Sequence, residues 1–189
     1  MAKINIIRKP IFFAHSGGSQ GSPGKGSFDL VSTLETELSN EFEIRNPVID
    51  NPETPTYMMW KKLFHKEFEN RAEPIALVGH SLGGSMLLKY LSEEEPNISI
   101  SGLFLISIPF WGKDGWDVED FVLPEKCEAK LRQISDVFLY HSKYDEIVPF
   151  EHLSFYKKVF SGATVREVEG KEHAFTRGLP DLILDLKNI

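Results

Sequence analysis

The sequence lacks the features that mark secreted and disulfide-stabilised proteins. Cys127 is its only cysteine and cannot form a disulfide within the chain, and one thiol in 189 residues is typical of a protein kept in a reducing compartment. The N-terminal segment carries Lys3, Asn5, Arg8 and Lys9, which leave no apolar run long enough for the core of a signal peptide. These two absences predict a cytoplasmic location.

Long hydrophobic runs and basic clusters are also missing. The longest apolar run covers residues 102–111 and contains Ser107, so it falls short of the roughly 18 residues of a membrane-spanning helix. The chain has 21 Lys and Arg against 28 Asp and Glu, a formal charge of -7, with no basic cluster to attract phosphate groups. We therefore expect neither a membrane nor a nucleic acid as a partner, and we expect a small molecule as the ligand.

The residues that are present have the proportions of a globular domain. Of the chain, 41% is hydrophobic, 26% charged and 12% aromatic. A chain of this length buries roughly 70% of the surface that its unfolded state exposes, so folding requires neither disulfides nor a metal. We expect one domain that spans residues 1–189.

Short apolar segments rich in Ile, Val and Phe alternate with longer segments whose apolar residues recur at helical spacing. Six strands are predicted, at residues 10–15, 42–48, 74–80, 100–108, 136–141 and 163–167, and residues 4–7 are a candidate edge strand. Helices are predicted within residues 28–38, 58–68, 82–90, 150–160 and 179–187. This alternation predicts an α/β fold: a three-layer α/β/α sandwich with a doubly wound, mainly parallel sheet of about six strands. Such a sheet binds its ligand at the carboxyl ends of the strands.

Residues 110–123 show no clean period and are predicted to form a loop. Phe110, Trp111 and Trp116 lie on it, directly after a predicted strand, where they could wall a substrate pocket at the carboxyl edge. The alternative is that these aromatic side chains only seal the top of the core. His15 and His80, which end the first and third predicted strands, complete the candidate pocket.

Residues 79–83 read Gly-His-Ser-Leu-Gly and match the pattern Gly-Xaa-Ser-Xaa-Gly. The match lies after an apolar strand segment and before a predicted helix that begins at Leu82. In so tight a turn the serine takes strained backbone angles, and the two glycines remove side chains that would clash. The pattern predicts Ser81 as a nucleophile raised above the sheet. The alternative is a serine that caps an ordinary helix.

A serine hydroxyl needs a base to remove its proton, and in this fold class the base follows the serine in the chain. His141, His152 and His173 follow Ser81. The first ends a predicted strand and the second lies in a helical segment, whereas His173 lies in a loop after the last strand, at the carboxyl edge. His173 is therefore the predicted general base.

An acid must orient that base, and it should lie between the serine and the histidine. Asp145 lies in the loop that leaves the fifth predicted strand, and the following Val-Pro pair leaves it at the tip of that loop. Glu146 is the close rival, and Asp114 and Asp117 in the aromatic loop are weaker ones. Asp145 is the predicted acid.

Attack on a carbonyl creates an oxyanion, which needs two fixed N–H donors. The amide of Leu82 lies at the start of the helix after Ser81, where N–H groups are free and the helix dipole favours negative charge. The second donor should come from the loop after the first strand, and Ser16 or Gly17 can supply it.

No cofactor or metal is expected. Residues 17–26 are rich in glycine but fail the Gly-Xaa4-Gly-Lys-Ser/Thr pattern of a phosphate loop at residues 19 and 26. No Cys and His residues have zinc-site spacing, and the acidic residues form no calcium loop.

Three segments together resemble the α/β-hydrolase superfamily: Gly-His-Ser-Leu-Gly-Gly at 79–84, Tyr-Asp-Glu-Ile-Val-Pro at 144–149 and Glu-His-Ala-Phe at 172–175. The small size and the lack of a long insertion after Pro109 resemble the compact, lidless serine hydrolases of the YdeN and retinoblastoma-binding hydrolase group. The resemblance implies a minimal hydrolase fold without a large cap, and hydrolysis of esters, thioesters, amides or related bonds. One departure is His15-Ser16, where many members have His-Gly, and it leaves the choice between Ser16 and Gly17 open.

The function that follows is a serine hydrolase that cleaves a small to medium acyl ester, thioester or related bond through an acyl-enzyme on Ser81. His173 would take the serine proton while Asp145 holds the imidazole, so we expect activity to rise with pH as the base loses its proton. Two alternatives use the same residues: a non-catalytic interaction protein on a hydrolase scaffold, and an acyltransferase.

Overall fold

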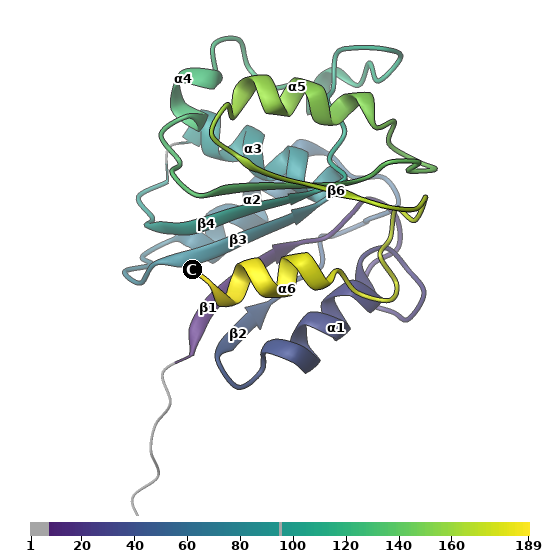
Figure 1. Ribbon diagram of the computed structural model, residues 1–189. Coiled ribbons are helices and arrows are strands. Elements are labelled where there is room, and N and C mark those ends of the chain that lie inside the picture. The colour runs from purple at the N-terminus through teal and green to yellow at the C-terminus, as the bar shows by residue number, and fades with distance from the viewer. Residues whose placement is uncertain (1–7, 95) are drawn as a thin grey trace, which may run out of the picture.

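The computed structural model describes residues 8–94 and 96–189, so the candidate strand at residues 4–7 lies outside the described part. Six parallel strands form one sheet in the order β2-β1-β3-β4-β5-β6 (Figure 1). The strands are β1 Lys9–Ala14, β2 Phe42–Arg45, β3 Ile75–His80, β4 Ile100–Ile106, β5 Val137–Ser142 and β6 Thr164–Val168. All six predicted strands are present, with ends within a few residues of those expected.

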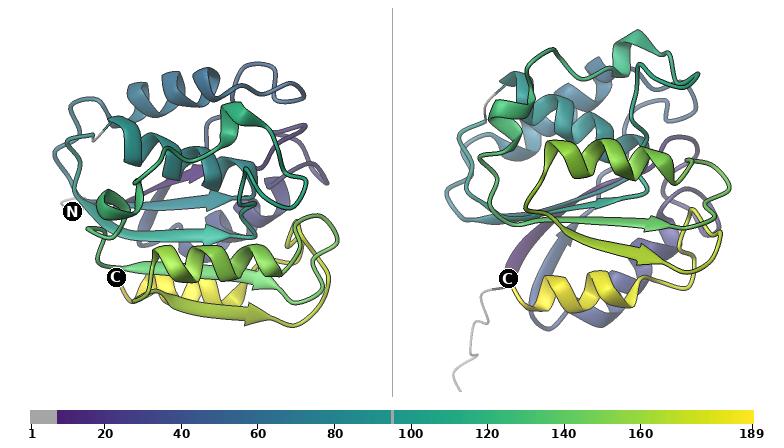
Figure 2. Two further views of the ribbon diagram at one scale, coloured as in Figure 1. Left: turned by 90° about the horizontal axis from the view of Figure 1, so that it is seen from above. Right: turned by 45° about the horizontal axis from the view of Figure 1, so that its top comes forward.

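Helices cover both faces of this sheet, which confirms the predicted three-layer sandwich. On one face lie α1 Phe28–Leu38 and α6 Pro180–Lys187. On the other lie α2 Tyr57–Phe68, α3 Leu82–Glu94, α5 Glu151–Val159 and a short helix, α4 Glu128–Leu131, that the sequence pattern did not predict. Figure 2 shows the same layers from two further directions. In the described ranges, no helix has both the length and the apolar character needed to cross a membrane.

The core lies on both sides of the sheet because successive residues of a strand point to opposite faces. In β1, Ile11 and Phe13 pack against α1 and α6, whereas Phe12 and Ala14 pack in the cluster that contains α2 and α3. All four side chains are buried. A strand covered on both faces is apolar throughout, and this is why the strands could be recognised as continuous apolar runs.

The strand order places a switch point at the centre of the sheet. From β1 the chain moves outward to β2, crosses back to β3 and then continues outward to β6. The loops after β1 and β3 therefore leave the sheet side by side and run in opposite directions, which opens a crevice between them. Residues 15–17 follow β1 and Ser81 follows β3, so the predicted nucleophile and oxyanion loop both lie at this crevice.

Residues 110–123 form the predicted loop, with one 3-10 turn, η1 Glu119–Phe121. Lys89 of α3 fastens the loop, because its Nζ donates hydrogen bonds to the carbonyl oxygens of Asp120 (3.0 Å) and Val122 (2.9 Å). The backbone N–H of Tyr57 donates to the Asp120 carboxylate at 2.6 Å. The loop is therefore tied to α2 and α3 rather than free to swing.

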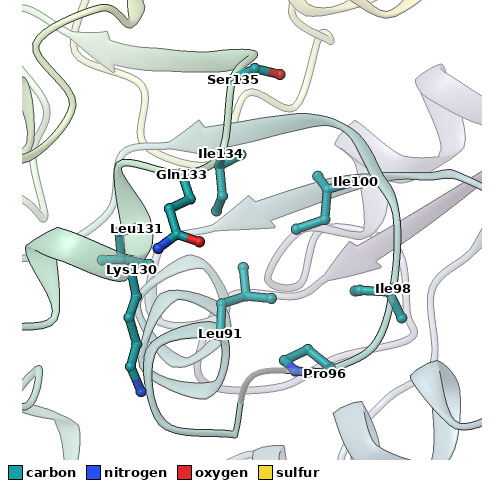
Figure 3. A pocket seen from close by; sticks show the side chains of 9 residues that line it. All are labelled: Leu91, Pro96, Ile98, Ile100, Lys130, Leu131, Gln133, Ile134 and Ser135. Atoms are coloured by element: carbon teal, nitrogen blue, oxygen red, sulfur yellow. The ribbon is translucent and has the colours of Figure 1, made fainter.

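A cavity of about 370 Å³ lies at the opposite, amino edge of the sheet, near the starts of β4 and β5 (Figure 3). Its lining includes Leu91, Ile98, Ile100, Leu131 and Ile134. Lys130 and Ser135 also line it, but it contains no histidine and none of the residues that the sequence predicts for catalysis. The candidate site is at the carboxyl edge.

Candidate active site

Ser81 occupies a strained turn between β3 and α3. Its φ is +51°, in the left-handed region that residues with a side chain seldom adopt. The turn lifts the residue to the carboxyl edge while α3 begins at once with Leu82. This is the conformation that the Gly-Xaa-Ser-Xaa-Gly pattern predicts for a nucleophile elbow.

The glycines around Ser81 allow backbones to touch. A Cβ atom on Gly79 would lie 2.4 Å from the Cα of Gly84, and one on Gly83 would lie 2.1 Å from the carbonyl oxygen of His15. A Cβ on Gly84 would lie 2.3 Å from a methyl group of Ile108. No side chain fits at these distances, so the three glycines let α3 start directly against β3 and the end of β1.

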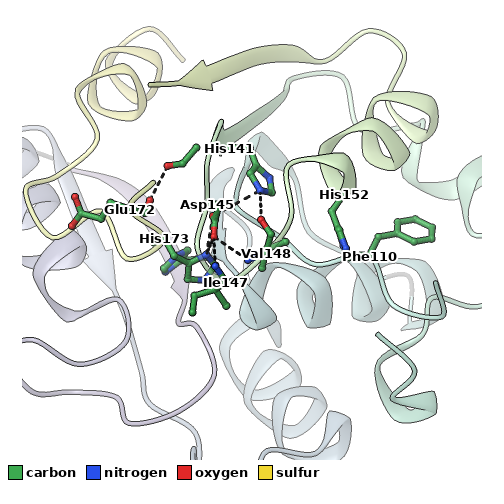
Figure 4. Close-up of polar contacts among 10 residues, drawn as sticks. Phe110, His141, Asp145, Ile147, Val148, His152, Glu172 and His173 are labelled. Atoms are coloured by element: carbon green, nitrogen blue, oxygen red, sulfur yellow. Dashed lines mark hydrogen bonds and ion pairs between the residues drawn. The ribbon is translucent and has the colours of Figure 1, made fainter. Parts of the chain in front are cut away.

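His173 and Asp145 are joined by hydrogen bonds, as Figure 4 shows. The Nδ1 atom of His173 lies 3.0 Å from Oδ1 and 2.9 Å from Oδ2 of Asp145. A carboxylate only accepts, so Nδ1 carries the hydrogen and Nε2 is left as the basic nitrogen. Oδ1 also accepts from the backbone N–H groups of Ile147 and Val148, each at 2.9 Å, which fixes the carboxylate.

The charge state of Asp145 follows from these contacts. Burial of its side chain would raise the pKa, but the hydrogen bond and charge of His173, together with the two backbone N–H groups, lower the pKa to about 2. Asp145 is therefore ionised throughout the neutral range, as the orienting partner of an imidazole must be.

The loops that carry these two residues are bonded to each other. The hydroxyl of Ser142 donates to the carbonyl oxygen of Glu172 at 2.7 Å, and the N–H of Tyr144 donates to the carbonyl of Gly170 at 3.0 Å. The rival acid Glu146 is exposed and lies 4.0 Å from Lys171. Among the acids considered from the sequence, Asp145 is the one brought to His173.

Ser81 and His173 open into one cavity of about 380 Å³. The residues that line it are Ser16, Gly17, Gly24, Gly26, His80, Ser81, Leu82, Pro109, Trp111, Trp116, Ile147, His173, Ala174 and Thr176. No Asp, Glu, Lys or Arg is among them. Within residues 8–94 and 96–189 the Ser81 hydroxyl makes no side-chain hydrogen bond, and a bond to the base that forms only with substrate is common in such sites.

Three of the five predicted pocket residues, His80, Trp111 and Trp116, line this cavity. Trp111 lines the cavity and also packs on the core, where it contacts the Phe121 ring edge to face with 4.9 Å between centroids.

The structure corrects the prediction for His15 and Phe110, which do not line the cavity. The Nε2 atom of His15 lies 3.0 Å from the carbonyl oxygen of Asn46, so the ring contacts the segment after β2. The Phe110 ring packs on Phe155 and Tyr156 around α5, at centroid distances of 4.9 and 5.3 Å. His15 does follow the end of β1, and Phe110 does lie on the loop after β4, but the contacts of the two side chains were not visible in the sequence.

Sequence reasoning missed six lining residues. Ala174 and Thr176 could have been found from their closeness to His173, and Ile147 from its closeness to Asp145. Gly24 and Gly26 belong to the glycine-rich stretch that was considered only as a phosphate loop. Pro109 gave no signal of its own.

The hydrogen bonds separate the two candidates for the second oxyanion donor. The N–H of Ser16 is occupied, because it donates to the hydroxyl oxygen of Ser27 at 2.9 Å. The N–H groups of Gly17 and Leu82 have no hydrogen-bond partner in the described part of the chain, and both residues line the cavity. Gly17 and Leu82 are thus the pair with N–H groups available to an oxyanion.

Among the described residues there is no group of three or more His, Cys, Asp or Glu side chains arranged to hold a metal ion. The two histidines that line the cavity are bonded to other groups: His173 to the Asp145 carboxylate, and His80 to the Ser27 hydroxyl and the His173 carbonyl. The chemistry available from the described residues is that of a hydroxyl, an imidazole and a carboxylate.

Comparisons with known proteins agree with this geometry. A family model described as serine hydrolase matches residues 29–174. The product of the ydeN gene of B. subtilis has a structure similar to this one with a TM-score of 0.82 at 20% identity, over 95% of this chain and 97% of that chain. No curated protein matches the sequence.

Two further solved structures share the fold. Est1E from Butyrivibrio proteoclasticus, solved with ferulic acid bound, has a TM-score of 0.69 at 18% identity, over 100% of this chain and 90% of that chain. An esterase, EaEST, from Exiguobacterium antarcticum has a TM-score of 0.67 at 14% identity, over 95% of this chain and 91% of that chain. At these identities the likeness shows the fold, which is the one that the sequence resemblance implied.

Proposed function

The chain belongs to the serine hydrolase family, and we propose that it cleaves a small to medium acyl ester, thioester or related bond through an acyl-enzyme on Ser81. One observation carries the proposal: His173, held by the Asp145 carboxylate, opens into the same cavity as the strained Ser81. That arrangement provides a nucleophile, a base and the group that orients the base.

In the first half-reaction, Nε2 of His173 takes the proton of the Ser81 hydroxyl as its oxygen attacks the acyl carbonyl. The negative charge moves to the carbonyl oxygen, where the N–H groups of Gly17 and Leu82 stabilise it. The imidazolium then gives its proton to the leaving alcohol or thiol as the old bond breaks. The acyl group remains on Ser81.

In the second half-reaction, water replaces the leaving group. His173 takes a proton from the water as its oxygen attacks the acyl-enzyme, and the same two N–H groups stabilise the second oxyanion. Collapse of this intermediate returns the proton to Ser81 and releases the acid. Asp145 stays ionised throughout and stabilises the imidazolium in both steps.

The cavity lining supports a neutral, largely apolar substrate. Trp111, Trp116, Pro109 and Ile147 supply apolar surface, and no lining side chain is an Asp, Glu, Lys or Arg that would pair with a charged substrate. The structural likeness to two esterases, one solved with ferulic acid bound, supports an ester as the bond cleaved. We also propose a small-molecule partner and a cytoplasmic location, the latter because the single cysteine, Cys127, is free and buried.

The test is the reaction with a fluorophosphonate probe, which phosphonylates an activated serine whatever the natural substrate. Intact mass should show one adduct per chain on the wild type and none on Ser81→Ala or His173→Ala. Ser92→Ala is the matched control, because Ser92 is buried away from the cavity and its hydroxyl donates to the carbonyl of Lys89. Folded wild type without an adduct would favour the non-catalytic interaction protein, and Ser81→Ala that keeps a tenth of the wild-type esterase rate would exclude Ser81 as the nucleophile.

A further inference from the structure

A buried chain of hydrogen bonds connects the two loops on either side of Ser81. It begins at the backbone N–H of Ser16, which donates to the hydroxyl oxygen of Ser27 at 2.9 Å. The same hydroxyl lies 2.8 Å from Nδ1 of His80. Nε2 of His80 in turn lies 2.9 Å from the backbone carbonyl oxygen of His173. Ser27 and His80 are both fully buried, so no solvent competes for these bonds.

The direction of each bond follows from the groups involved. A carbonyl oxygen only accepts, so Nε2 of His80 carries the hydrogen and donates to His173. Burial and the neighbouring His173 lower the pKa of His80 to about 3, so its ring is neutral and Nδ1 is an acceptor. The Ser27 hydroxyl therefore donates to Nδ1 and uses a lone pair to accept from Ser16.

The side chain of Ser27 does not cap the helix that follows it. It directly precedes α1, where a serine side chain normally accepts a hydrogen bond from the first turn of the helix, yet it makes no such cap. The loop is also built closely around it, because a Cβ on Gly26 would lie 2.7 Å from the carbonyl oxygen of Ser19. The Ser27 hydroxyl is buried between two loops and bonds to them instead of to its own helix. Helix stability therefore does not explain a serine at this position.

We propose that Ser27 and His80 are positioning residues that hold the Gly17 backbone and the His173 backbone at fixed places around Ser81. Gly17 follows Ser16 directly, so the bond from Ser16 to Ser27 sets where the Gly17 N–H points. The bond from His80 to the His173 carbonyl fixes the position of the His173 backbone relative to Ser81. Asp145 fixes the orientation of the His173 ring. The Ser27 hydroxyl thus fixes the positions of both the Gly17 N–H and the His173 backbone.

This inference rests on the proposed function, and its experiment is the rate of fluorophosphonate labelling in Ser27→Ala. The variant removes one oxygen atom, and the bonds of His173 to Asp145 remain. A misplaced oxyanion donor and base should lower the second-order rate constant by about 10- to 100-fold. Every chain should still be labelled at the end of the reaction, and Ser92→Ala should react within about twofold of the wild type.

Rate and extent separate positioning from a purely structural role. If Ser27 only stabilised the fold, a fraction of the chains would be inactive and the rest would label at the wild-type rate. A wild-type rate constant in Ser27→Ala, at full or reduced extent, would therefore overturn the proposal. A wild type that does not label at all would instead overturn the proposed function.

A second pair of variants removes the effect of volume. Ser27→Thr and Ser27→Val add equal volume at this buried position, but only threonine keeps the hydroxyl. We expect the threonine variant to label about tenfold faster than the valine variant. Equal rate constants for the two would contradict a role for the hydroxyl, even if Ser27→Ala proved too unstable to measure.

Discussion

At the scale of the residue, the orientation of the His173 imidazole depends on one carboxylate, and hydrogen bonds fix the position of that carboxylate. Asp145 has a side chain with 0% exposure and accepts hydrogen bonds from His173 and from two backbone N–H groups. Its ionised form therefore fixes the tautomer of His173 that leaves Nε2 free. The chain order of serine, acid and histidine was enough to make Asp145 a candidate. Its preference over Glu146 rested only on the shape expected for the loop.

Asp145→Asn tests this dependence. The amide has nearly the same shape but no charge, and it would offer an N–H where His173 needs an acceptor, so the histidine would favour the unproductive tautomer. We expect kcat for a p-nitrophenyl ester to fall by about 10³- to 10⁴-fold with the fold intact. Glu146→Gln is the control and should stay within about twofold. A loss of less than tenfold in Asp145→Asn would mean that another group orients the base.

At the scale of the element, the loop of residues 110–123 is a fixed wall whose anchor lies on α3. Lys89 has a side chain only 12% exposed, and besides its two carbonyl partners it lies 4.8 Å from the centre of the Tyr57 ring. The loop could be predicted from the sequence, because the apolar residues of the segment recur with neither helical nor strand spacing. The anchor could not be predicted, because a lysine on a helix looks like any solvated residue until the loop is folded over it.

Lys89→Met should loosen this wall without touching the reacting groups. Trp111 and Trp116 would lose their fixed position while Ser81, Asp145 and His173 keep theirs, so the change falls on substrate binding. We expect KM for a p-nitrophenyl ester to rise by roughly 3- to 10-fold with kcat nearly unchanged. Lys62→Met, at an exposed position of α2, is the control. A fall in kcat with an unchanged KM would show that the loop acts on the chemistry instead.

At the scale of the whole molecule, the alternation of apolar strands and amphipathic helices was sufficient to predict the sheet, its parallel direction and its three layers. It was not sufficient for α4 or for the directions of His15 and Phe110, because these depend on which loops meet after folding. The network of Ser16, Ser27, His80 and His173 was hidden for the same reason, since its members come from three separate parts of the chain: the loop before α1, the end of β3 and the loop after β6.

Buried histidines also give the whole molecule a pH-dependent stability. Burial lowers the pKa of His15, His80, His141 and His152 below the value of about 6.5 that they have in the unfolded chain. Below pH 6.5 the unfolded state then binds more protons than the folded state, so the free energy of unfolding falls as pH falls. Each such histidine contributes up to about 1.4 kcal/mol per pH unit in this window. The carboxylate of Asp145, with a pKa near 2, adds a loss only below about pH 4.

Urea unfolding at pH 7.5 and pH 5.0 measures this effect. We expect the free energy of unfolding to be lower at pH 5.0 by more than about 2 kcal/mol. His65→Gln should leave the difference unchanged, because His65 is exposed. Equal stability at the two pH values would mean that the buried histidines are protonated in the folded chain or change partners as pH falls.

In the proposed mechanism, Ser81 carries the acyl group between two half-reactions. The most direct measurement is rapid quenching of wild-type protein during turnover of p-nitrophenyl acetate, followed by peptide mass mapping. We predict a burst of nitrophenol and an acetyl group on the peptide that contains Ser81, both absent from Ser81→Ala. Turnover without an acetyl group on Ser81, or a burst that survives in Ser81→Ala, would contradict the account.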